Sequence, residues 1–412
     1  MTVEGAARDP LRVAILGFGT VGRAVARMLV DGQPGLRLAC VFNRDVERKR
    51  VEWVPEGVRW TDAIDDALAA EVDVVVELVG GVEPAATWMR QALAAGKSVV
   101  TANKQAIAHR GPELFELARA RGIRLGFEAS VAGGIPAIRG IQEGLVADEL
   151  TRVQGILNGT CNFILTRMES APVAFAAVVA EAQEKGYAEV DPSADLDGFD
   201  AQAKLAILSA VGLRRWVEPA GIPCRSIRGL EAADFRAART LGRAIRQLSA
   251  VERVANGSGV RASVGPALVR RTSRFAQVMG SENVVVVDGV WGGQTAFIGQ
   301  GAGGGPTAVA VVSDLRSIVA GDAHAGTELF PACEPAHDVV PQVERAYYLR
   351  VDEAGITDER LSAHGIAVAR RLDDGRGARA IVTAACAPAA IEAVTTDVSG
   401  ASAIVVALPL ID

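Results

Sequence analysis

The chain has 412 residues, of which 50% are hydrophobic, and it carries a net charge of −6. This length predicts two or three domains with a well-buried core. The acidic balance, without a long basic run, argues against nucleic acid and anionic membranes as partners. No run of about 18 or more uncharged apolar residues is present, so no segment is expected to span a bilayer. Glu4, Arg8 and Asp9 precede the first apolar run, which argues against a signal peptide.

Five cysteines and four histidines are dispersed along the chain, and no C-x-x-C pair occurs. Scattered cysteines in odd number are typical of reduced thiols in a cytoplasmic protein. A zinc site is therefore not expected.

Residues 1–150 have the pattern of a nucleotide-binding domain. A β-branched run at 13–16 leads into GFGTVG, and a helical pattern follows. G-x-G-x-x-G in that position permits a tight turn and brings a helix N-terminus to a pyrophosphate. The alternative is a glycine-rich turn without a ligand. The candidate contacts to the cofactor are Gly17, Phe18, Gly19, Thr20, Val21 and Gly22.

The second expected strand ends at Asn43, Arg44 and Asp45, about twenty residues beyond the glycine motif. An acid at this place grips the ribose of NAD, whereas an arginine suits the 2′-phosphate of NADP. Arg44, with Lys49 and Arg50 close by, favours acceptance of NADP and leaves NAD open. An ordinary surface role for Arg44 is the alternative.

Further strands and helices alternate over the same region. An apolar strand at 72–81, a helix at 84–95 and a strand at 98–103 predict a doubly wound parallel sheet, where ligands gather at the carboxyl ends of strands. Lys104 follows such an end, although a lysine there is often only solvated. Glu128 is the only acid in the strand-and-turn segment at 123–136.

The stretch GYAEVDPSADLDGFDAQAK, residues 186–204, gathers five carboxylates and ends on Lys204. It resembles a calcium loop only faintly, because Phe199 breaks the alternation of oxygen ligands. A solvated loop with a surface pair of Asp200 and Lys204, worth about 0.3–0.5 kcal/mol, is another interpretation. The apolar helix that continues beyond Lys204 favours a buried position instead.

The remainder is expected to form an α+β domain and a small module. Strands are expected at 261–270, 275–280 and 283–290, with covering helices. The glycine-rich segment 299–315 enters a helix and either approaches the cofactor or serves as a hinge. Residues 326–340 have the composition of a linker, and a small α/β module follows.

Seven stretches in this order together resemble homoserine dehydrogenase across residues 10 to about 320. They are GFGTVG, VELVGGVEPA, VVTANK, EASVAGGIP, GILNGTCNFIL, GYAEVDPSADLDGFDAQAKLAIL and GQGAGGGPTAVAVVSDL. The resemblance implies interconversion of L-homoserine and L-aspartate 4-semialdehyde with NAD or NADP, in threonine, methionine and isoleucine biosynthesis. It also implies a homodimer or homotetramer.

The implied fold is α/β in three parts. A Rossmann domain covers 1–150, and a homoserine-binding and dimerisation domain of α+β type covers 151–325. Within the second, the segment 299–320 is expected to pack back towards the nucleotide domain. The third part, at 341–412, resembles an ACT module.

The resemblance also assigns roles to individual residues. Lys204 and Lys104 match the catalytic lysines, Lys104 also reaching the cofactor. The implied homoserine ligands are Glu189, Asp195 and Asp200; the implied backbone contacts to the cofactor are Gly186 and Gly301; and the implied ligands of a sodium-like ion are Glu128 and the carbonyls of Val131, Gly133 and Ile135.

A lysine amine near pKa 10.4 is a poor base at neutral pH, but burial and a neighbouring cation lower that pKa. Two lysines held close together are therefore expected to depress each other, while the carboxylate of Asp200 acts in the opposite direction. In the reducing direction Lys204 would donate a proton to the substrate oxygen.

Two departures from the family pattern stand out. Cys161 occupies a position that is usually threonine, and the tail is short and lacks D-x-P-G-V-L, so feedback by threonine is not expected. Two alternatives for function remain. An aspartate-semialdehyde dehydrogenase would use Cys161 as a thioester nucleophile, and a nucleotide sensor would bind cofactor without turnover.

Overall fold

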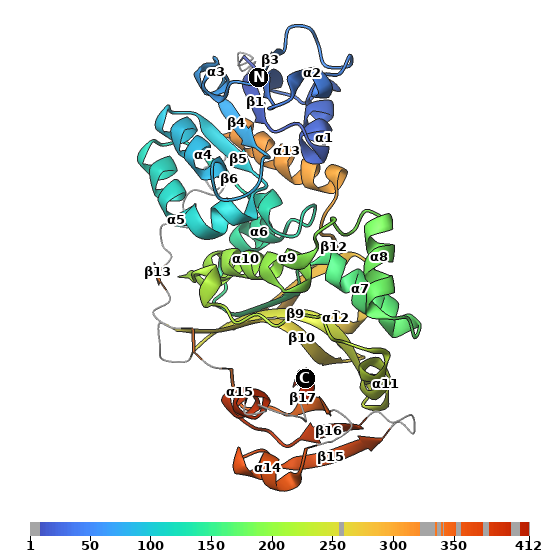
Figure 1. Ribbon diagram of the computed structural model, residues 1–412. Coiled ribbons are helices and arrows are strands. Elements are labelled where there is room, and N and C mark those ends of the chain that lie inside the picture. The colour runs from blue at the N-terminus through green and yellow to red at the C-terminus, as the bar shows by residue number, and fades with distance from the viewer. Residues whose placement is uncertain are drawn as a thin grey trace.

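The computed structural model describes residues 9–254, 259–321, 334–335, 339–340, 342–351, 356–373, 379–396 and 404–411. These residues form three parts stacked along one long axis (Figure 1). The expected linker at 326–340 lies almost wholly outside the described residues, apart from 334–335 and 339–340. Within the described ranges, no helix combines the length and apolar character needed to cross a bilayer.

The N-terminal part confirms the predicted doubly wound sheet. Its six parallel strands lie in the order β3-β2-β1-β4-β5-β6. The strand order reverses between β1 and β4, and ligands bind at such switch points. The strands are β1 (Leu11–Leu16), β2 (Leu36–Phe42), β3 (Arg59–Thr61), β4 (Val74–Glu77), β5 (Ser98–Thr101) and β6 (Leu125–Gly126). The helices are α1 (Thr20–Val30), α2 (Val46–Lys49), α3 (Ile64–Ala69), α4 (Ala85–Ala94) and α5 (Lys104–Ala120).

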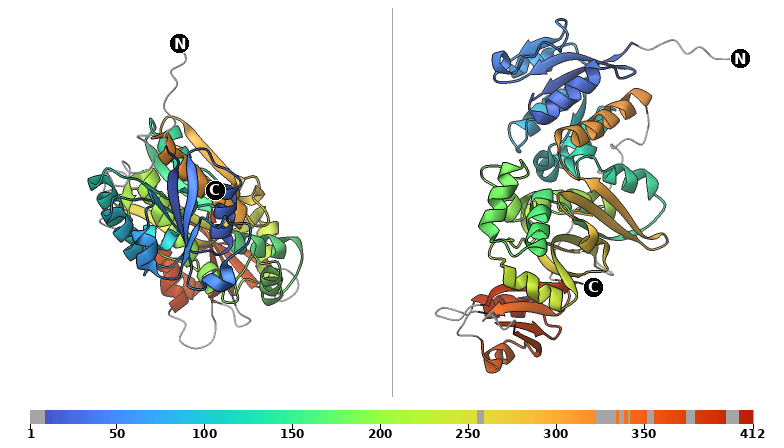
Figure 2. Two further views of the ribbon diagram at one scale, coloured as in Figure 1. Left: turned by 90° about the horizontal axis from the view of Figure 1, so that it is seen from above. Right: turned by 90° about the vertical axis from the view of Figure 1, so that its right-hand side faces the viewer.

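One helix of this part comes from much later in the chain. The helix α13 (Gly304–Ala320) lies beside α1 in the top part of the molecule (Figures 1 and 2). Val311 and Leu315 of α13 share a buried cluster with Val25 and Leu29 of α1. The segment that follows the central strands thus completes the N-terminal part.

The central part is an antiparallel sheet with helices on one face. Its five strands lie in the order β12-β11-β7-β9-β10. The strands are β7 (Leu150–Ile156), β9 (Arg243–Arg253), β10 (Val260–Arg270), β11 (Glu282–Gly289) and β12 (Gly293–Gln300). The helices over one face are α7 (Gly159–Ser170), α9 (Ser193–Leu196) and α10 (Phe199–Leu208) (Figure 1).

Further elements complete the central part and its junction with the N-terminal part. The remaining helices are α6 (Ala137–Arg139), α8 (Phe175–Glu184), α11 (Ala232–Thr240) and α12 (Arg274–Gln277). Tighter or wider turns are η1 (Glu128–Ser130), η2 (Gly140–Gly144), η3 (Ser209–Leu213) and η4 (Pro219–Gly221). The short strands β8 (Arg215–Trp216) and β13 (Glu334–Pro335) pair in parallel.

The prediction of a strand at 275–280 is wrong, because the helix α12 covers part of that range. The side chain of Ser273 accepts a hydrogen bond from the backbone N–H of Ala276 at 3.3 Å and caps the helix. Such a local bond offers the backbone an alternative to strand pairing. Phe275 is buried in the helix, as it would be on the core face of a strand. Its hydrophobicity therefore could not distinguish a helix from a strand.

The elements of the C-terminal part follow one another as β-α-β-β-α-β, which is the order of a ferredoxin-like fold. Its elements are β14 (Tyr347–Val351), α14 (Asp358–Ala363), β15 (Val368–Asp373), β16 (Arg379–Thr383), α15 (Pro388–Thr396) and β17 (Ile404–Ile411). The strand β17 pairs in parallel with β10 at Leu268–Leu410 and Val269–Ile411. The central and C-terminal strands therefore form one nine-stranded sheet. The likeness to an ACT module stays a prediction.

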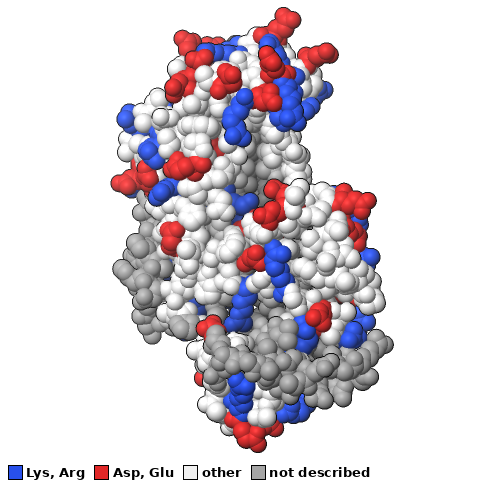
Figure 3. Space-filling model, viewed as in Figure 1, with Lys and Arg blue, Asp and Glu red and all other residues white. Residues whose placement is uncertain are grey.

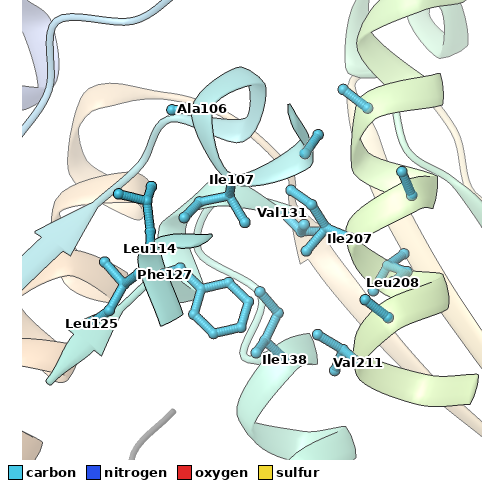
Figure 4. Close-up of a cluster of buried hydrophobic side chains, with 14 of the residues drawn as sticks. Ala106, Ile107, Leu114, Leu125, Phe127, Val131, Ile138, Ile207, Leu208 and Val211 are labelled. Carbon is cyan, nitrogen blue, oxygen red and sulfur yellow. The ribbon is translucent and has the colours of Figure 1, made fainter. Parts of the chain in front are cut away.

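The boundary between the nucleotide-binding and central domains is itself a hydrophobic core. Figure 4 shows Ile107 of α5 and Val131 facing Ile207 of α10, with Phe127 and Ile138 below them. Because α5 and α10 pack directly on each other, residues at their ends are held in fixed register across the domain boundary.

We expect Phe127→Ala to lower the free energy of unfolding by about 3–5 kcal/mol, because it removes a fully buried ring. Phe127 is 2% exposed and packs edge-on against Phe115 at 4.9 Å. Denaturant unfolding followed by circular dichroism would measure the loss. Phe199→Ala, which truncates a ring that is 52% exposed, is the matched control. Equal losses in the two variants would contradict this account of the core.

Candidate active site

A single carboxylate bridges two lysines where α5 meets α10. The Oδ1 of Asp200 lies 2.8 Å from the Nζ of Lys104, and its Oδ2 lies 2.7 Å from the Nζ of Lys204. The side chains of Asp200 and Lys204 are 8% and 12% exposed, whereas that of Lys104 is 37% exposed. The pair at Asp200 and Lys204 is thus buried, which contradicts the surface-pair interpretation.

Local sequence fixes the position of both helix ends. The side chain of Asn103 caps α5 by accepting the backbone N–H of Ala106 at 3.0 Å, so Lys104 is the first helical residue. Gly198, at φ +89°, starts α10 in a conformation that favours glycine. Asp200 therefore lies in the first turn of α10, and its charge suits that end of the helix.

The electrostatics of the cluster favour the charged state of Asp200. Burial raises the pKa of this carboxyl, but the opposite charges of Lys204 and Lys104 outweigh burial and hold the pKa below its usual range. In return, the charge of Asp200 raises the pKa of the Lys104 amine above its usual value, against the effect of burial. The carboxylate of Asp200 therefore acts on Lys104 in the expected opposite direction, and its direct contact outweighs burial.

Asn158, which the sequence analysis did not single out, organises the acids. Its Nδ2 donates to the Oδ1 of Asp195 at 2.7 Å and to the Oδ2 of Asp200 at 2.8 Å. Its Oδ1 accepts the backbone N–H of Cys161 at 2.8 Å and caps α7. An Asn-Gly pair just before a helical pattern is the signal that could have identified it.

The remaining acids of the stretch 186–204 differ in setting. Asp195 is half-buried, and burial together with the charge of Asp200 raises the pKa of its carboxyl. Glu189 is exposed, yet its charge acts on Lys104. Within the described residues, no group of three or more His, Cys, Asp or Glu side chains could hold a metal ion.

The first glycine turn has the shape that a pyrophosphate requires. Gly17 adopts φ +100°, and a Cβ there would lie 2.8 Å from the carbonyl oxygen of Leu78. A Cβ at Gly22 would lie 2.1 Å from the carbonyl oxygen of Gly17, so both positions require glycine. Gly19 faces open space at the start of α1, where a ligand could approach the backbone.

The other candidates in this turn differ in exposure. Thr20 is exposed and Val21 half-buried, whereas Phe18 is fully buried, edge-on to Trp60 at 4.9 Å. Only the backbone of Phe18 could therefore contact a cofactor. Arg44 is exposed just beyond β2, at the carboxyl edge of the same sheet.

A second glycine segment meets the first. A Cβ at Gly304 would lie 2.9 Å from the side chain of Thr20, so the starts of α13 and α1 are in contact. A Cβ at Gly301 would lie 2.1 Å from the amide of Asn283, whose side-chain nitrogen and oxygen are buried. Gly301 is itself buried, whereas Gly186 is exposed at the end of α8 with φ +74°. The contact of Gly304 with Thr20 favours the first interpretation of segment 299–315, an approach to the cofactor turn.

A recess separates the nucleotide-binding and central domains on one face of the molecule. Figure 3 shows basic and acidic side chains together at its lower edge. Lys104, Asp200 and Lys204 lie where these two domains meet.

Glu128 lies in a second, separate cluster. Its carboxylate accepts the backbone N–H groups of Ile138 at 3.0 Å and Arg139 at 2.8 Å, while its own N–H donates to Asp314. Burial and the charge of Asp314 raise the pKa of Glu128 to about 7. Burial likewise raises the pKa of Asp314 to about 6, against the opposing charge of Arg139.

The three implied carbonyl ligands lie on the loop that joins Glu128 to α6, the helix whose N–H groups its carboxylate accepts. Val131, Gly133 and Ile135 are all buried there. A Cβ at Gly133 would lie 2.6 Å from the carbonyl oxygen of Gly301, so this loop supports the second glycine segment.

Cys161 does not have the properties of a nucleophile. Its thiol is fully buried and lies 3.1 Å from the carbonyl oxygen of Asp195. Burial raises the pKa of this thiol well above its usual value. Because the thiolate is the reactive species, the geometry argues against thioester chemistry at Cys161.

Comparison with known families gives one consistent result. Residues 17–128 match the family model described as homoserine dehydrogenase, NAD binding domain, and residues 136–315 match the model described as homoserine dehydrogenase.

Individual relatives carry the same name. The homoserine dehydrogenase of Synechocystis is 39% identical over 317 residues, which cover 75% of this chain and 73% of that protein. That of Mycobacterium tuberculosis is 42% identical over 316 residues, 74% of this chain and 71% of the relative.

Solved structures agree. A homoserine dehydrogenase from Thiobacillus denitrificans has a TM-score of 0.86 and 33% identity, and the match covers 98% of this chain and 99% of that one. A hyperthermophilic archaeal homoserine dehydrogenase in complex with NADPH has a TM-score of 0.65 and 26% identity, over 77% of this chain and all of the other.

The acids around Glu128 give stability a defined pH dependence. Between about pH 4.5 and 7 the folded protein keeps a proton on Glu128 that the unfolded chain has released. This group's contribution to the free energy of unfolding therefore falls as pH rises through that window, by about 3 kcal/mol at about 1.4 kcal/mol per pKa unit. Asp314 acts in the same direction.

Denaturant unfolding at a series of pH values would measure this fall. We expect Glu128→Gln to flatten the slope between about pH 4.5 and 7, whatever its effect on absolute stability. An unchanged slope in that variant would show that Glu128 does not titrate in this window.

Proposed function

Because the chain belongs to the homoserine dehydrogenase family, we propose that Lys204 and Lys104 are the catalytic lysines of its reaction. The reaction transfers a hydride between L-homoserine and a nicotinamide cofactor and yields L-aspartate 4-semialdehyde, a step of amino-acid biosynthesis. The observation that carries the proposal is the carboxylate of Asp200 held between the two amines.

Oxidation of a primary alcohol releases a hydride from carbon and a proton from oxygen. We assign the proton transfer to Lys204. Its amine donates to Asp200 at 2.7 Å and to the carbonyl of Leu157 at 2.9 Å. A lysine ammonium has three donors, so one is left for the substrate oxygen. In the reducing direction this donor gives its proton to the oxygen as hydride reaches carbon.

Lys104 has a different role in this proposal. Its raised pKa keeps the amine protonated at neutral pH. A fixed positive charge beside the reacting oxygen stabilises negative charge that develops there. The substrate's ammonium and hydroxyl ends would be held by Glu189, Asp195 and Asp200. The negative charge of these side chains suits a substrate with an ammonium group better than a substrate that is an anion.

We expect Lys204→Ala to lower kcat by about 10²–10⁴-fold, the usual size of general acid-base assistance. Binding of NADPH, measured by fluorescence, should be unchanged, because Lys204 lies on the central domain. Lys204→Arg keeps the charge but cannot release a proton, so it should also be slow. Near-normal turnover by either variant would remove the assignment.

The same assay separates the two alternatives for function. Reduction of aspartate semialdehyde with NADPH is expected, whereas phosphate-dependent oxidation of the aldehyde would support aspartate-semialdehyde dehydrogenase. Cofactor binding without either activity would support a nucleotide sensor.

The cofactor is NAD or NADP, and we propose a preference for NADP. Asp45, the only acid directly after β2, accepts the backbone N–H of Arg48 at 3.3 Å as the cap of α2. Asn43 in turn accepts the N–H of Asp45 at 3.0 Å. The exposed guanidinium of Arg44 is therefore the group suited to meet a ribose 2′-substituent, which favours a phosphate.

Arg44→Ala should raise the KM for NADP by about tenfold, the loss of one charge-assisted hydrogen bond, and leave the KM for NAD unchanged. Steady-state kinetics with both cofactors would measure this. Arg37→Ala, an exposed arginine within β2, is the control. A parallel change for NAD and NADP would contradict the role of Arg44.

We further propose a sodium-like ion at Glu128 with the carbonyls of Val131, Gly133 and Ile135. Glu128 and Asp314 are two buried acids held close together, and a cation would neutralise negative charge there beyond what the guanidinium of Arg139 balances. Carboxylate and carbonyl oxygens suit such an ion. Sodium should then lower the pH at which Glu128 loses its proton, in comparison with a bulky organic cation at equal ionic strength.

A homodimer or homotetramer is also proposed. A cavity lies between the central sheet and the C-terminal part, and it is lined by Leu248, Ala250 and Pro266 of the sheet and by Tyr347 of the C-terminal part. The described cysteines are free thiols, which supports the cytoplasmic location we propose.

A further inference from the structure

We propose that the C-terminal part helps to build the substrate site, and that Arg350 is a positioning residue for Asp195. The connection runs through residues 225–230, called here the bridging segment. It contacts β14 on one side and α9 on the other. The inference rests on the proposed role of Asp195 in substrate binding.

On the side of the C-terminal part, Arg350 is anchored by three groups. Its Nε donates to the Oδ1 of Asp234 at 2.9 Å, its Nη2 to the carbonyl of Gly229 at 2.6 Å, and its Nη1 lies 3.1 Å from Glu231. Tyr348 donates to the same oxygen of Asp234 at 2.9 Å. Arg350 is 8% exposed and Asp234 fully buried, so the bond between these two side chains forms away from solvent screening, whereas Glu231 is exposed.

On the side of the substrate site, the bridging segment holds the end of α9. The N–H of Ile227 donates to the carbonyl of Leu196 at 2.9 Å. Ser226 and Arg228 both donate to the Oδ1 of Asp197, at 2.7 and 2.9 Å. The segment therefore fixes the two residues that directly follow Asp195.

The turn held in this way carries the acids of the site. Asp195 shares the amide of Asn158 with Asp200, so a shift of α9 would change the placement of both carboxylates. Hydrophobic contacts follow the same route. Leu196 and Ile227 belong to one buried cluster with Tyr348 and Leu408 of the C-terminal part.

The test is the steady-state kinetics of four variants of the full chain: Arg350→Met, Arg228→Ala, Tyr348→Phe and Leu361→Ala. The first three each remove one polar link of the connection. Leu361 is fully buried in the core of the C-terminal part, in the cluster that does not include Tyr348. Leu361→Ala therefore lowers stability without removing a contact to the bridging segment.

We expect Arg350→Met to raise the KM for L-homoserine by roughly threefold to thirtyfold, with little change in the KM for NADP. Arg228→Ala and Tyr348→Phe should have the same signature to a smaller degree. Leu361→Ala should leave both KM values unchanged. The double variant Arg350→Met/Arg228→Ala should show less than the product of the two single effects, because both act through one segment.

Two results would overturn the proposal: equal KM values in Arg350→Met and Leu361→Ala, or independent effects in the double variant. If Arg350→Met does not fold, Arg228→Ala and Tyr348→Phe decide the question, because each leaves the buried charges of Arg350 and Asp234 paired. Asp195→Asn separates this inference from the proposed function. A normal KM for L-homoserine in Asp195→Asn would remove the role of Asp195, whereas a raised KM with normal values in the connection variants would remove only the role of Arg350.

Discussion

The site depends on one carboxylate that is charged although it is buried. Desolvation alone would favour neutral Asp200, and two amines from different domains reverse that preference. The contacts are mutual, because each lysine is also held in place by the acid. Without Asp200, the amines of Lys104 and Lys204 would face each other at the domain boundary without the carboxylate that bridges them.

The helices that carry these groups explain how a contact between domains can be so well defined. Lys104 begins α5 and Asp200 lies in the first turn of α10, and the two helices meet through apolar side chains, with Ile107 facing Ile207 (Figure 4). Packed interiors are stiff, so the apolar contacts between the two helices fix the positions of the polar side chains at the helix ends. The cofactor side is built in a similar way, with Gly304 against Thr20 where α13 returns to α1.

Much of this could be predicted from the sequence. Periodicity and glycine placement predicted the parallel sheet, and the resemblance predicted which acids and lysines belong together. What escaped prediction were relations between distant residues. Asn158 joins Asp195 and Asp200 only after folding, and the direction of the pKa shift of Lys104 depends on a contact distance that no spacing encodes. The helix at Arg274–Gln277 was missed because one serine cap outweighed a pattern compatible with a strand.

The pairing of β10 with β17 has a consequence for any shortened form of this chain. β17 covers the edge of β10 at Leu268 and Val269, an edge that would otherwise present unpaired backbone groups. Exposed strand edges invite pairing with other chains. A version shortened before residue 342 would uncover that edge together with the apolar surface under Tyr348 and Leu408, and would be prone to aggregate.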